Sequence, residues 1–405
     1  MPSGTPESVL SFPPPASLDP FDHPDALYDE LRRTSPVRRI VLPDLTPAFL
    51  VTGYEEVRRV LVDPRFSRAA AAAPDTGKLV PGRIVDESLL GLDPPDHTRI
   101  RRLVARAFTH HQVERLRPGI RAIIAELLDT VAGRTSADLM AVLAVPLPVR
   151  VICLMLGVPP EDDERFRAWS NALVSSMDGD MDLVARAGAE LDGYLHGLLA
   201  AKRAAPGADL MSALHLAQEG DDQLTDKEIV NLASILLVAG NETTTSQLGL
   251  YILELTRRPD LADRLRADPA LLPAAVEELL RLQPLSTIGG ALPRIALEDI
   301  ELAGTVIPAG SVVLPATESA NHDPAVFTDP HTLDIGRADN RHLSFGNGAH
   351  HCLGAQLARL ELREALGAVL DRLPGFRLAV PVGEVRLRAN SLIRCPDALP
   401  LEWDA

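Results

Sequence analysis

The chain has 405 residues, 46% of them hydrophobic, so it is long enough to bury a large core as one large domain or two ordinary ones. Its formal net charge of −16 and pI of about 5.1 disfavour general nucleic-acid binding, because phosphate contacts need a concentrated basic surface. Three widely spaced cysteines, Cys153, Cys352 and Cys395, are a poor disulfide framework and fit a reducing cytoplasm.

The N-terminal segment shows no sign of export or membrane insertion. Residues 1–20 are rich in Pro and Ser and predict irregular chain on the surface. They have neither the basic start nor the apolar run of a signal peptide, so we expect no export. The longest strongly apolar stretch, Ile229 to Gly240, is shorter than the roughly 20 residues that span a bilayer. We therefore expect a cytoplasmic protein without a membrane partner.

The first half of the chain predicts an α+β opening followed by helices. Val37–Leu42 and Ala48–Thr52 flank the breaker Pro43-Asp44 and predict a strand pair, after which Tyr54–Val62 is helical in pattern. Glycines and prolines over Ser67–Gly91 predict a loop. The elements expected after it are a polar helix from about Asp96 to Phe108 and several amphipathic helices from Val113 to about Arg203.

A long helix is expected in the second half. Thr225 and Glu228 form a capping box ahead of an apolar run that continues until Pro259, which gives a helix of roughly 50 Å at 1.5 Å per residue. Gly240 costs about 1 kcal/mol against alanine in a helix interior, and the threonines that follow it add a little more. Such local strain at mid-helix often marks function.

The C-terminal part combines short strands with two more helices. The predicted elements are a helix over Pro273–Leu282, strands over Ile300–Leu302, Thr305–Ile307 and Ser311–Leu314, and a last helix that starts near Cys352. The fold class is therefore mainly α with small β-sheets. Because no repeat, linker or low-complexity break interrupts residues 1–405, one domain is the better interpretation.

The segment before the last helix carries the strongest chemical signal. Phe345-Gly-Asn-Gly-Ala-His-His-Cys-Leu-Gly354 permits a tight hairpin at Gly346 and Gly348 that can press against a flat ligand. The helix start directs N–H groups and positive dipole at the Cys352 sulfur, which favours thiolate over thiol. The alternative is that Cys352 is a buried cysteine with only a structural role. A zinc site is weaker, because adjacent ligands cannot readily surround one tetrahedral ion.

This segment resembles the haem-binding signature of the cytochrome P450 superfamily, Phe-x-x-Gly-x-x-x-Cys-x-Gly, at Phe345, Gly348, Cys352 and Gly354. Further family motifs follow the expected order over nearly the whole chain: a Glu-x-x-Arg pair at Glu278 and Arg281, and a meander over residues 320–337 in which His322 stands where arginine is commoner. The resemblance implies a helical prism in which haem b lies between the long helix and the helix at Cys352. It implies that Cys352 is the iron ligand.

The resemblance also assigns roles to other residues. His97, Arg101, Arg294 and His350 match positions that contact the haem propionates, although for each alone a solvated surface role is the default. Gly240 lets O2 approach the long helix, and the Glu242-Thr243 acid/alcohol pair passes protons to it. The implied substrate wall, for which plain core packing is the alternative, comprises Leu90, Ile235, Val238, Ala239, Ile288, Gly289, Gly290, Ala291, Leu292 and Leu392.

These roles imply a monooxygenase that inserts one oxygen atom of O2 into a C–H or C=C bond. Because the wall is apolar or small, we expect a hydrophobic polyketide, peptide or terpenoid intermediate of bacterial specialised metabolism, either free or tethered to a carrier protein. Steroid or xenobiotic hydroxylation, a peroxide-driven haem enzyme and a non-catalytic haem-binding protein are the alternatives. Electrons are expected from a separate ferredoxin-type protein and its reductase, which would dock near Arg102, Arg106 and Arg359.

Overall fold

The computed structural model describes a defined part of the chain. The described residues are 10–13, 19–21, 25–42, 44–73, 88–174, 181–219, 222–286, 290, 292–389, 391 and 393–405. Ile288, Gly289, Ala291 and Leu392, four residues of the expected substrate wall, lie outside them, and so does most of the expected loop, residues 74–87.

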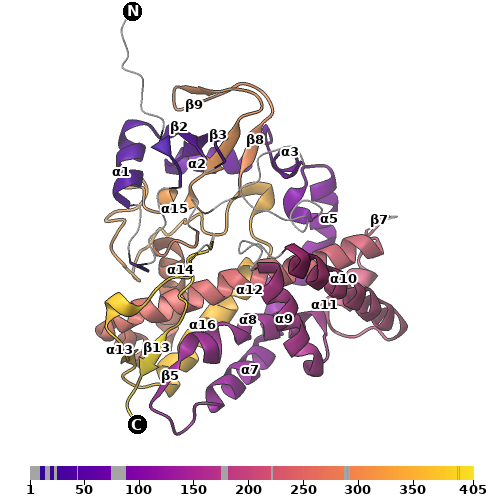
Figure 1. Cartoon of the computed structure of the whole chain (residues 1–405), viewed down its shortest axis with the longest axis vertical. Coiled ribbons are helices and arrows are strands. Elements are labelled where there is room, and N and C mark those ends of the chain that lie inside the picture. The colour runs from indigo at the N-terminus through magenta and orange to yellow at the C-terminus, as the bar shows by residue number, and fades with distance from the viewer. Residues whose placement is uncertain are drawn as a thin grey trace, which may run out of the picture.

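Helices build most of the molecule and gather in its lower part in Figure 1, whereas the strands lie mainly above them. The helices of the N-terminal half are α1 (Asp25–Thr34), α2 (Tyr54–Val62), α3 (Arg68–Ala72), α5 (Asp96–Ala105), α6 (His110–Glu114), α7 (Arg117–Asp129), α8 (Pro146–Leu156), α9 (Asp163–Val174) and α10 (Met181–Ala204). Those of the C-terminal half are α11 (Leu210–Leu216), α12 (Asp226–Thr256), α13 (Pro259–Ala267), α14 (Leu272–Leu282), α15 (Thr317–Ala320) and α16 (Ala355–Arg372). The expectation of a mainly helical fold is confirmed.

The largest sheet joins segments from both ends of the chain. Among the described residues its strand order is β1-β2-β3-β11-β8-β4. These strands are β1 (Leu10–Ser11), β2 (Val37–Val41), β3 (Pro47–Val51), β4 (Phe66–Ser67), β8 (Arg294–Ala296) and β11 (Val312–Pro315). The predicted pair β2–β3 is antiparallel, with Val37 opposite Val51. Further small strands are β5 (Ser136–Asp138), β6 (Gln218–Glu219), β7 (Asp222–Gln223), β9 (Ile300–Leu302), β10 (Thr305–Ile307), β12 (Arg377–Leu378) and β13 (Pro400–Glu402).

Two expectations about irregular chain are corrected. Within residues 1–20, Leu10–Ser11 forms β1 and pairs with β2 in parallel. The expected loop from Ser67 opens instead on the helix α3, because the Ser67 hydroxyl accepts the Ala70 N–H at 2.8 Å and an alanine run follows. The pairing of β4 with β8 sets Ser67 opposite Ile295, so Arg68 comes to lie near Arg294.

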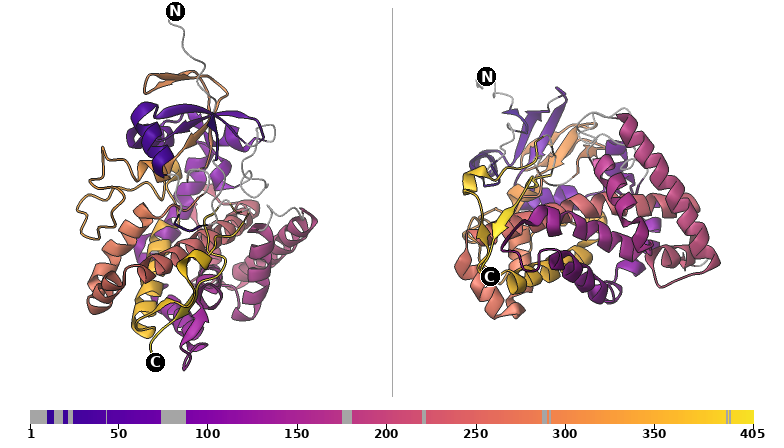
Figure 2. Two further views of the ribbon diagram at one scale, coloured as in Figure 1. Left: turned by 60° about the vertical axis from the view of Figure 1, so that its left-hand side comes forward. Right: turned by 60° about the horizontal axis from the view of Figure 1, so that its bottom comes forward.

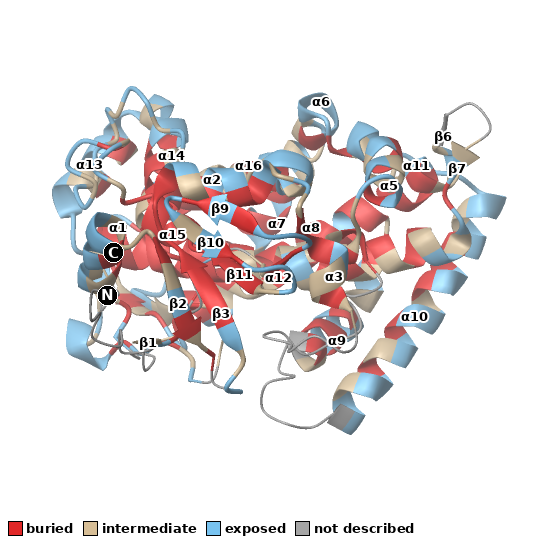
Figure 3. Cartoon of the chain, turned by 90° about the horizontal axis from the view of Figure 1, so that it is seen from above, coloured by how far each residue is buried: buried red, intermediate tan, exposed pale blue. Residues whose placement is uncertain are grey.

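Helix α12 is the central element and crosses the molecule in both views of Figure 2. The predicted capping box is confirmed: the Thr225 N–H donates to the Glu228 carboxylate at 2.8 Å, and the Glu228 N–H donates to the Thr225 hydroxyl at 3.3 Å. Figure 3 shows α12 within the red, buried interior rather than on the pale blue surface. None of the helices in the described ranges is both long and apolar enough to cross a membrane.

The Glu278–Arg281 pair holds the meander that leads to the cysteine loop. Both side chains are fully buried, and the Arg281 guanidinium donates two bonds, of 2.9 and 2.8 Å, to the Glu278 carboxylate. Arg281 also donates to the carbonyl oxygens of Asn321 at 2.9 Å and Pro330 at 2.6 Å. Arg337 donates to Glu278 at 3.2 Å from the far end of the meander. Residues 320–337 are thereby fixed beneath α14.

Candidate functional site

The cysteine loop forms a closed hairpin in front of α16. Gly346 and Gly348 have φ of +70° and +72°, a backbone region that favours glycine. A Cβ at Gly348 would stand 2.8 Å from the Leu61 carbonyl oxygen, so a steric clash also excludes a larger residue at this position. The Cys352 N–H donates to the Phe345 carbonyl at 2.8 Å and ties the two ends of the hairpin together.

The helix itself begins later than expected, at Ala355 rather than near Cys352, because the Cys352 N–H is used in the hairpin and Gly354 is the N-cap. The Gly354 N–H still points at the sulfur and favours the thiolate, as do the charges of Arg101 and Arg359. Burial outweighs them and raises the pKa of the Cys352 thiol above its usual range. The backbone N–H thus acts on the sulfur in the expected direction although burial outweighs it, and a cation bound at the sulfur would favour the thiolate further.

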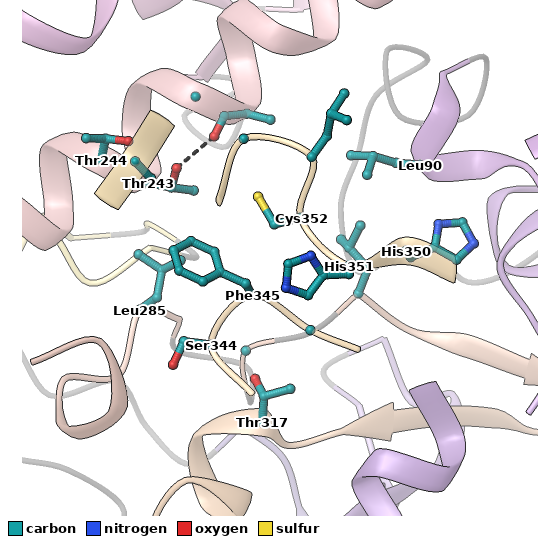
Figure 4. Close-up of a pocket in the computed structure, with 18 of the residues that line it drawn as sticks. Leu90, Thr243, Thr244, Leu285, Thr317, Ser344, Phe345, His350, His351 and Cys352 are labelled. Atoms are coloured by element: carbon teal, nitrogen blue, oxygen red, sulfur yellow. Dashed lines mark hydrogen bonds between the residues drawn. The ribbon is translucent and has the colours of Figure 1, made fainter. Parts of the chain in front are cut away.

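A cavity of about 380 Å³ opens over Cys352. Figure 4 shows the sulfur on the side of its loop that faces Thr243 of α12, and the Phe345 ring beside it. The thiol is exposed to this cavity although protein surrounds it. A Cβ added at Gly354 would meet nothing within 4 Å, so the first turn beside the sulfur is open to a flat ligand. Cys352, Gly354 and Phe345 therefore fit the face of a planar macrocycle.

One end of the cavity gathers basic side chains, including all four that were expected at the propionates. His97 is buried, and neither of its ring nitrogens has a hydrogen-bond partner among the described residues. Its ring lies 4.3 Å from the ring of His350. Burial, helped by the charges of Arg294 and His97, lowers the pKa of His350 to about 3. Burial also lowers the pKa of Arg294 to about 9.

Such a cluster calls for a bound anion. Protonated His350 and charged Arg294 are both disfavoured here because little negative charge compensates them; Asp93 is the acidic group that acts on both. Arg101 lines the same cavity and donates to the His351 carbonyl at 2.5 Å. Two carboxylates of a macrocycle would give His97 its missing partners. The donor set therefore fits the propionates of haem.

Helix α12 forms the wall opposite Cys352. Gly240, Thr243 and Thr244 all line the cavity. The Thr243 hydroxyl donates to the Ala239 carbonyl at 2.7 Å, a side-chain bond that competes with the helical one, as Figure 4 shows. The assigned helix nevertheless runs without interruption from Asp226 to Thr256. A Cβ at Gly240 would stand 2.7 Å from Ile152 of α8, so tight helix packing also requires this glycine.

Glu242 is not on the cavity wall. Its carboxylate is partly buried, accepts a hydrogen bond from Ser391 and lies near Arg388. Burial raises the pKa of Glu242, against the opposing effect of Arg388. The side chain thus contacts the C-terminal loop that carries Arg388 and Ser391.

The described residues of the expected substrate wall are mostly placed as predicted. Leu90, Ile235, Ala239, Gly290 and Leu292 line the cavity. Val238 does not; it packs against the main helical core, because it lies on another side of α12. Its neighbour Leu236 lines the cavity instead.

Sequence reasoning did not identify three polar residues of this cavity. Arg68 is buried next to the basic cluster and donates to the carbonyls of Leu90 at 3.0 Å and Pro293 at 2.5 Å. Its signal is weak, a single cation ahead of five alanines, and only the β4–β8 pairing brings it to Arg294. Gln247 of α12 and Glu361 of α16 each bury a side-chain oxygen that has no hydrogen-bond partner in the described chain. Burial raises the pKa of Glu361 well above its usual range.

Comparison with known proteins identifies the family. The cytochrome P450 family matches residues 183–392. The chain is 48% identical to a nocardicin C N-oxygenase of Nocardia uniformis subsp. tsuyamanensis, over 95% of this chain and 98% of the relative. It is 45% identical to a mycinamicin IV hydroxylase/epoxidase of Micromonospora griseorubida, over 93% and 94%. The crystal structure of the LnmA hydroxylase from the leinamycin pathway of Streptomyces atroolivaceus superposes with a TM-score of 0.91 at 44% identity, over 98% of this chain and 100% of that one. With a cysteine loop, a facing helix and a basic end of the cavity arranged for haem, the chain belongs to the cytochrome P450 family and is a monooxygenase.

Proposed function

We propose that this monooxygenase inserts one oxygen atom of O2 into a C–H or C=C bond of a largely hydrophobic intermediate of bacterial specialised metabolism. The cavity wall above Cys352 carries the proposal, because Leu90, Ile235, Leu285 and Leu292 make it mainly apolar. A pocket of this kind selects an apolar ligand, and its few polar groups orient it. Relatives named for nocardicin, mycinamicin and leinamycin chemistry support the same substrate class.

The cofactor of this proposal is haem b, bound without covalent links to its ring. Cys352 would hold the iron, and His97, Arg101, Arg294 and His350 would hold the propionates. Cys153 and Cys395 are both buried away from the cavity lining, so neither is placed for a thioether bond. When bound, thiolate-ligated haem supplies the activation of O2.

The proton supply would come from Thr243 and Glu242. Thr243 lines the cavity, and Glu242, the residue before it in the sequence, interacts with Ser391 and Arg388. A carboxyl with a raised pKa can pick up a proton from solvent and pass it to the hydroxyl. Glu242 is thus the entry of the relay and Thr243 its last group.

Two variants test this relay. Thr243→Ala should consume reductant at a rate comparable to wild type but divert it to hydrogen peroxide, because the hydroxyl no longer directs the proton. Glu242→Gln should slow turnover as a whole, because the amide cannot carry the proton. The measurements are product formed and peroxide released per reductant consumed. Full product yield in Thr243→Ala, without extra peroxide, would contradict a role for this hydroxyl.

A ferredoxin-type protein with its reductase would deliver the electrons. Arg359 is a weaker docking residue than the sequence suggested, because Glu277 accepts two bonds from its guanidinium, at 2.6 and 2.8 Å. Arg102 and Arg106, both exposed on the surface near α5, stay the main docking residues, although Arg102 also lies 3.8 Å from the Asp222 carboxylate. If this is correct, raising the ionic strength should slow reduction of wild type more than that of the Arg102→Ala/Arg106→Ala variant.

The substrate class is tested by a spectral titration. Macrolide, peptide, terpenoid and steroid candidates, the first two also as carrier-protein thioesters, are added to the ferric protein while the Soret band is recorded. A spectral shift at micromolar concentration, followed by an oxygenated product with O2 and a ferredoxin system, supports the proposal for that class. Turnover of the steroid alone would favour the steroid alternative. Product formation that needs only hydrogen peroxide would favour the peroxide-driven one.

A further inference from the structure

A second cluster of metal-binding side chains lies away from the haem cavity, where α1 meets α15 and the meander (Figure 1). We propose that Asp25, His322 and His331 form a site for a divalent transition metal of the zinc type. One ligand atom from each residue lies within 4.8 Å of the other two. Asp25 begins α1, His322 follows α15, and His331 lies in the meander, so three segments that are distant in sequence meet at this point.

The distances suit a tetrahedral ion after small side-chain movements. Two ligands of a zinc ion with bonds of about 2.0–2.1 Å stand about 3.3 Å apart. Asp25 Oδ2 and His331 Nδ1 are already 3.5 Å apart. The rings of His322 and His331 are stacked, with centroids 5.1 Å apart and an angle of 21° between the planes, so the His331 ring must rotate to turn its in-plane lone pair toward an ion that His322 also binds. Asp25 and His331 are each about two-fifths exposed, at 41% and 43%, so both can adjust their rotamers.

Each histidine has a partner that orients it as a ligand. His322 is buried, and its Nδ1 lies 2.9 Å from the Glu318 carbonyl oxygen. Because a carbonyl only accepts, this bond places the proton on Nδ1 and leaves the lone pair on Nε2. Asp29, one turn after Asp25, has Oδ2 at 3.4 Å from His331 Nε2 and would hold that ring with Nδ1 toward the metal. Such carboxylate and carbonyl partners are usual for histidines that bind zinc.

The proposed metal would connect α1 to the meander, the segment that supports the cysteine loop. His322 and His331 directly follow Asn321 and Pro330, whose carbonyls accept hydrogen bonds from the buried Arg281. The Asn321 side chain accepts the Leu343 N–H at 2.7 Å, two residues before Phe345. A cation held by these histidines would therefore stiffen the same segments that present Cys352. Two neutral imidazoles, one carboxylate and one water would complete four ligands, a set that zinc accepts.

Zinc binding to the untagged holoprotein tests the site. The protein is stripped with EDTA and dialysed against micromolar ZnCl2 at pH 7.5, and bound zinc is measured per haem. We expect about one equivalent in wild type that is lost in His331→Ala, an exposed position, and in Asp25→Asn, a partly exposed one, at both of which folding should survive. His110→Ala/His111→Ala, which removes an adjacent pair of exposed histidines elsewhere, should keep that equivalent. Absence of bound zinc in wild type, or its persistence in both site variants, would overturn the proposal.

Thermal unfolding gives an independent readout. Free zinc about a hundredfold above Kd should raise the Tm of a chain of 405 residues by about 3 °C. The same shift is expected in the His110/His111 variant and none in His331→Ala. An equal shift in His331→Ala would contradict the site. Because neither readout involves substrate, this outcome is separate from that of the proposed oxygenation.

Discussion

The chain buries arginine in two places that differ in what lies opposite the charge. Beneath α14, the Arg281 guanidinium has the Glu278 carboxylate, two backbone carbonyls and a second arginine that shares the same carboxylate. At the cavity, Arg294 donates to the carbonyls of Leu292 and Pro293, and the charge of Asp93 only partly offsets the effects of burial and of Arg68. The first arrangement is complete within the protein. The second carries surplus positive charge, and that surplus distinguishes a ligand site from a structural pair.

The largest effect is expected where the complete pair is broken. Arg281→Met keeps the length of the side chain but leaves Glu278 buried without its main partner and frees the carbonyls of Asn321 and Pro330. Removing one partner of a buried ion pair costs about 3–5 kcal/mol of unfolding free energy. The check is chemical denaturation of the haem-bound protein, together with its soluble yield.

A surface pair with the same spacing is the matched control. Arg58 and Glu55 are also three residues apart on a helix and 2.9 Å from one another, but their side chains are 49% and 62% exposed. Arg58→Met should change the unfolding free energy by less than about 0.5 kcal/mol, because solvent already screens the pair. Equal losses in the two variants would mean that burial of Arg281 is not what makes its pair important.

The incomplete cluster should respond differently to the same substitution. Arg294→Met removes a buried cation that Asp93 and two backbone carbonyls compensate only in part, so the free energy of unfolding of the haem-free form should stay the same or rise. Haem release to an excess of apo-globin should become about 10- to 100-fold faster, because a hydrogen bond to a charged group contributes about 1.5–3 kcal/mol. Loss of stability in the haem-free form would show that Arg294 acts as Arg281 does.

How much could be predicted from the sequence depends on how far apart along the chain the interacting residues lie. Patterns within one segment were sufficient for the capping box at Thr225, the strand pair β2–β3 and the hairpin at Gly348, because their partners lie close along the chain. Family motifs placed His97, Arg294 and His350 at one cavity although up to 253 residues separate them. Arg68 has no such motif. It reaches the cluster only through sheet pairing over more than 220 residues, which local reasoning cannot supply.

Neighbouring positions on α12 were assigned to the same substrate wall but face different directions in the structure. Ala239 and Ile235 line the cavity while Val238 does not, because at 3.6 residues per turn one position changes the direction of a side chain by about 100°. The hydrophobic character of the three residues is similar, so composition could not separate them. At Cys352 the sequence showed the hairpin and the nearby helix start, which favour the thiolate, but not the burial, which raises the pKa of the thiol.

The smallest effect concerns pH and the histidines of the basic cluster. Burial and neighbouring cations hold the pKa of His350 at about 3 and lower that of His97, against 6.5 in the unfolded chain. Between these values the unfolded haem-free chain binds more protons than the folded one, so its folded state loses stability as pH falls from about 6.5 toward 3. Propionates beside His350 would raise its pKa and reduce this loss. Urea unfolding at pH 7 and 5.5 should therefore show a steeper decline for the haem-free protein than for the haem-bound one, and a shallower decline in haem-free His350→Gln. The exposed His110→Gln control should keep the slope of wild type; a slope that His350→Gln leaves unchanged would mean that this ring does not carry the surplus charge.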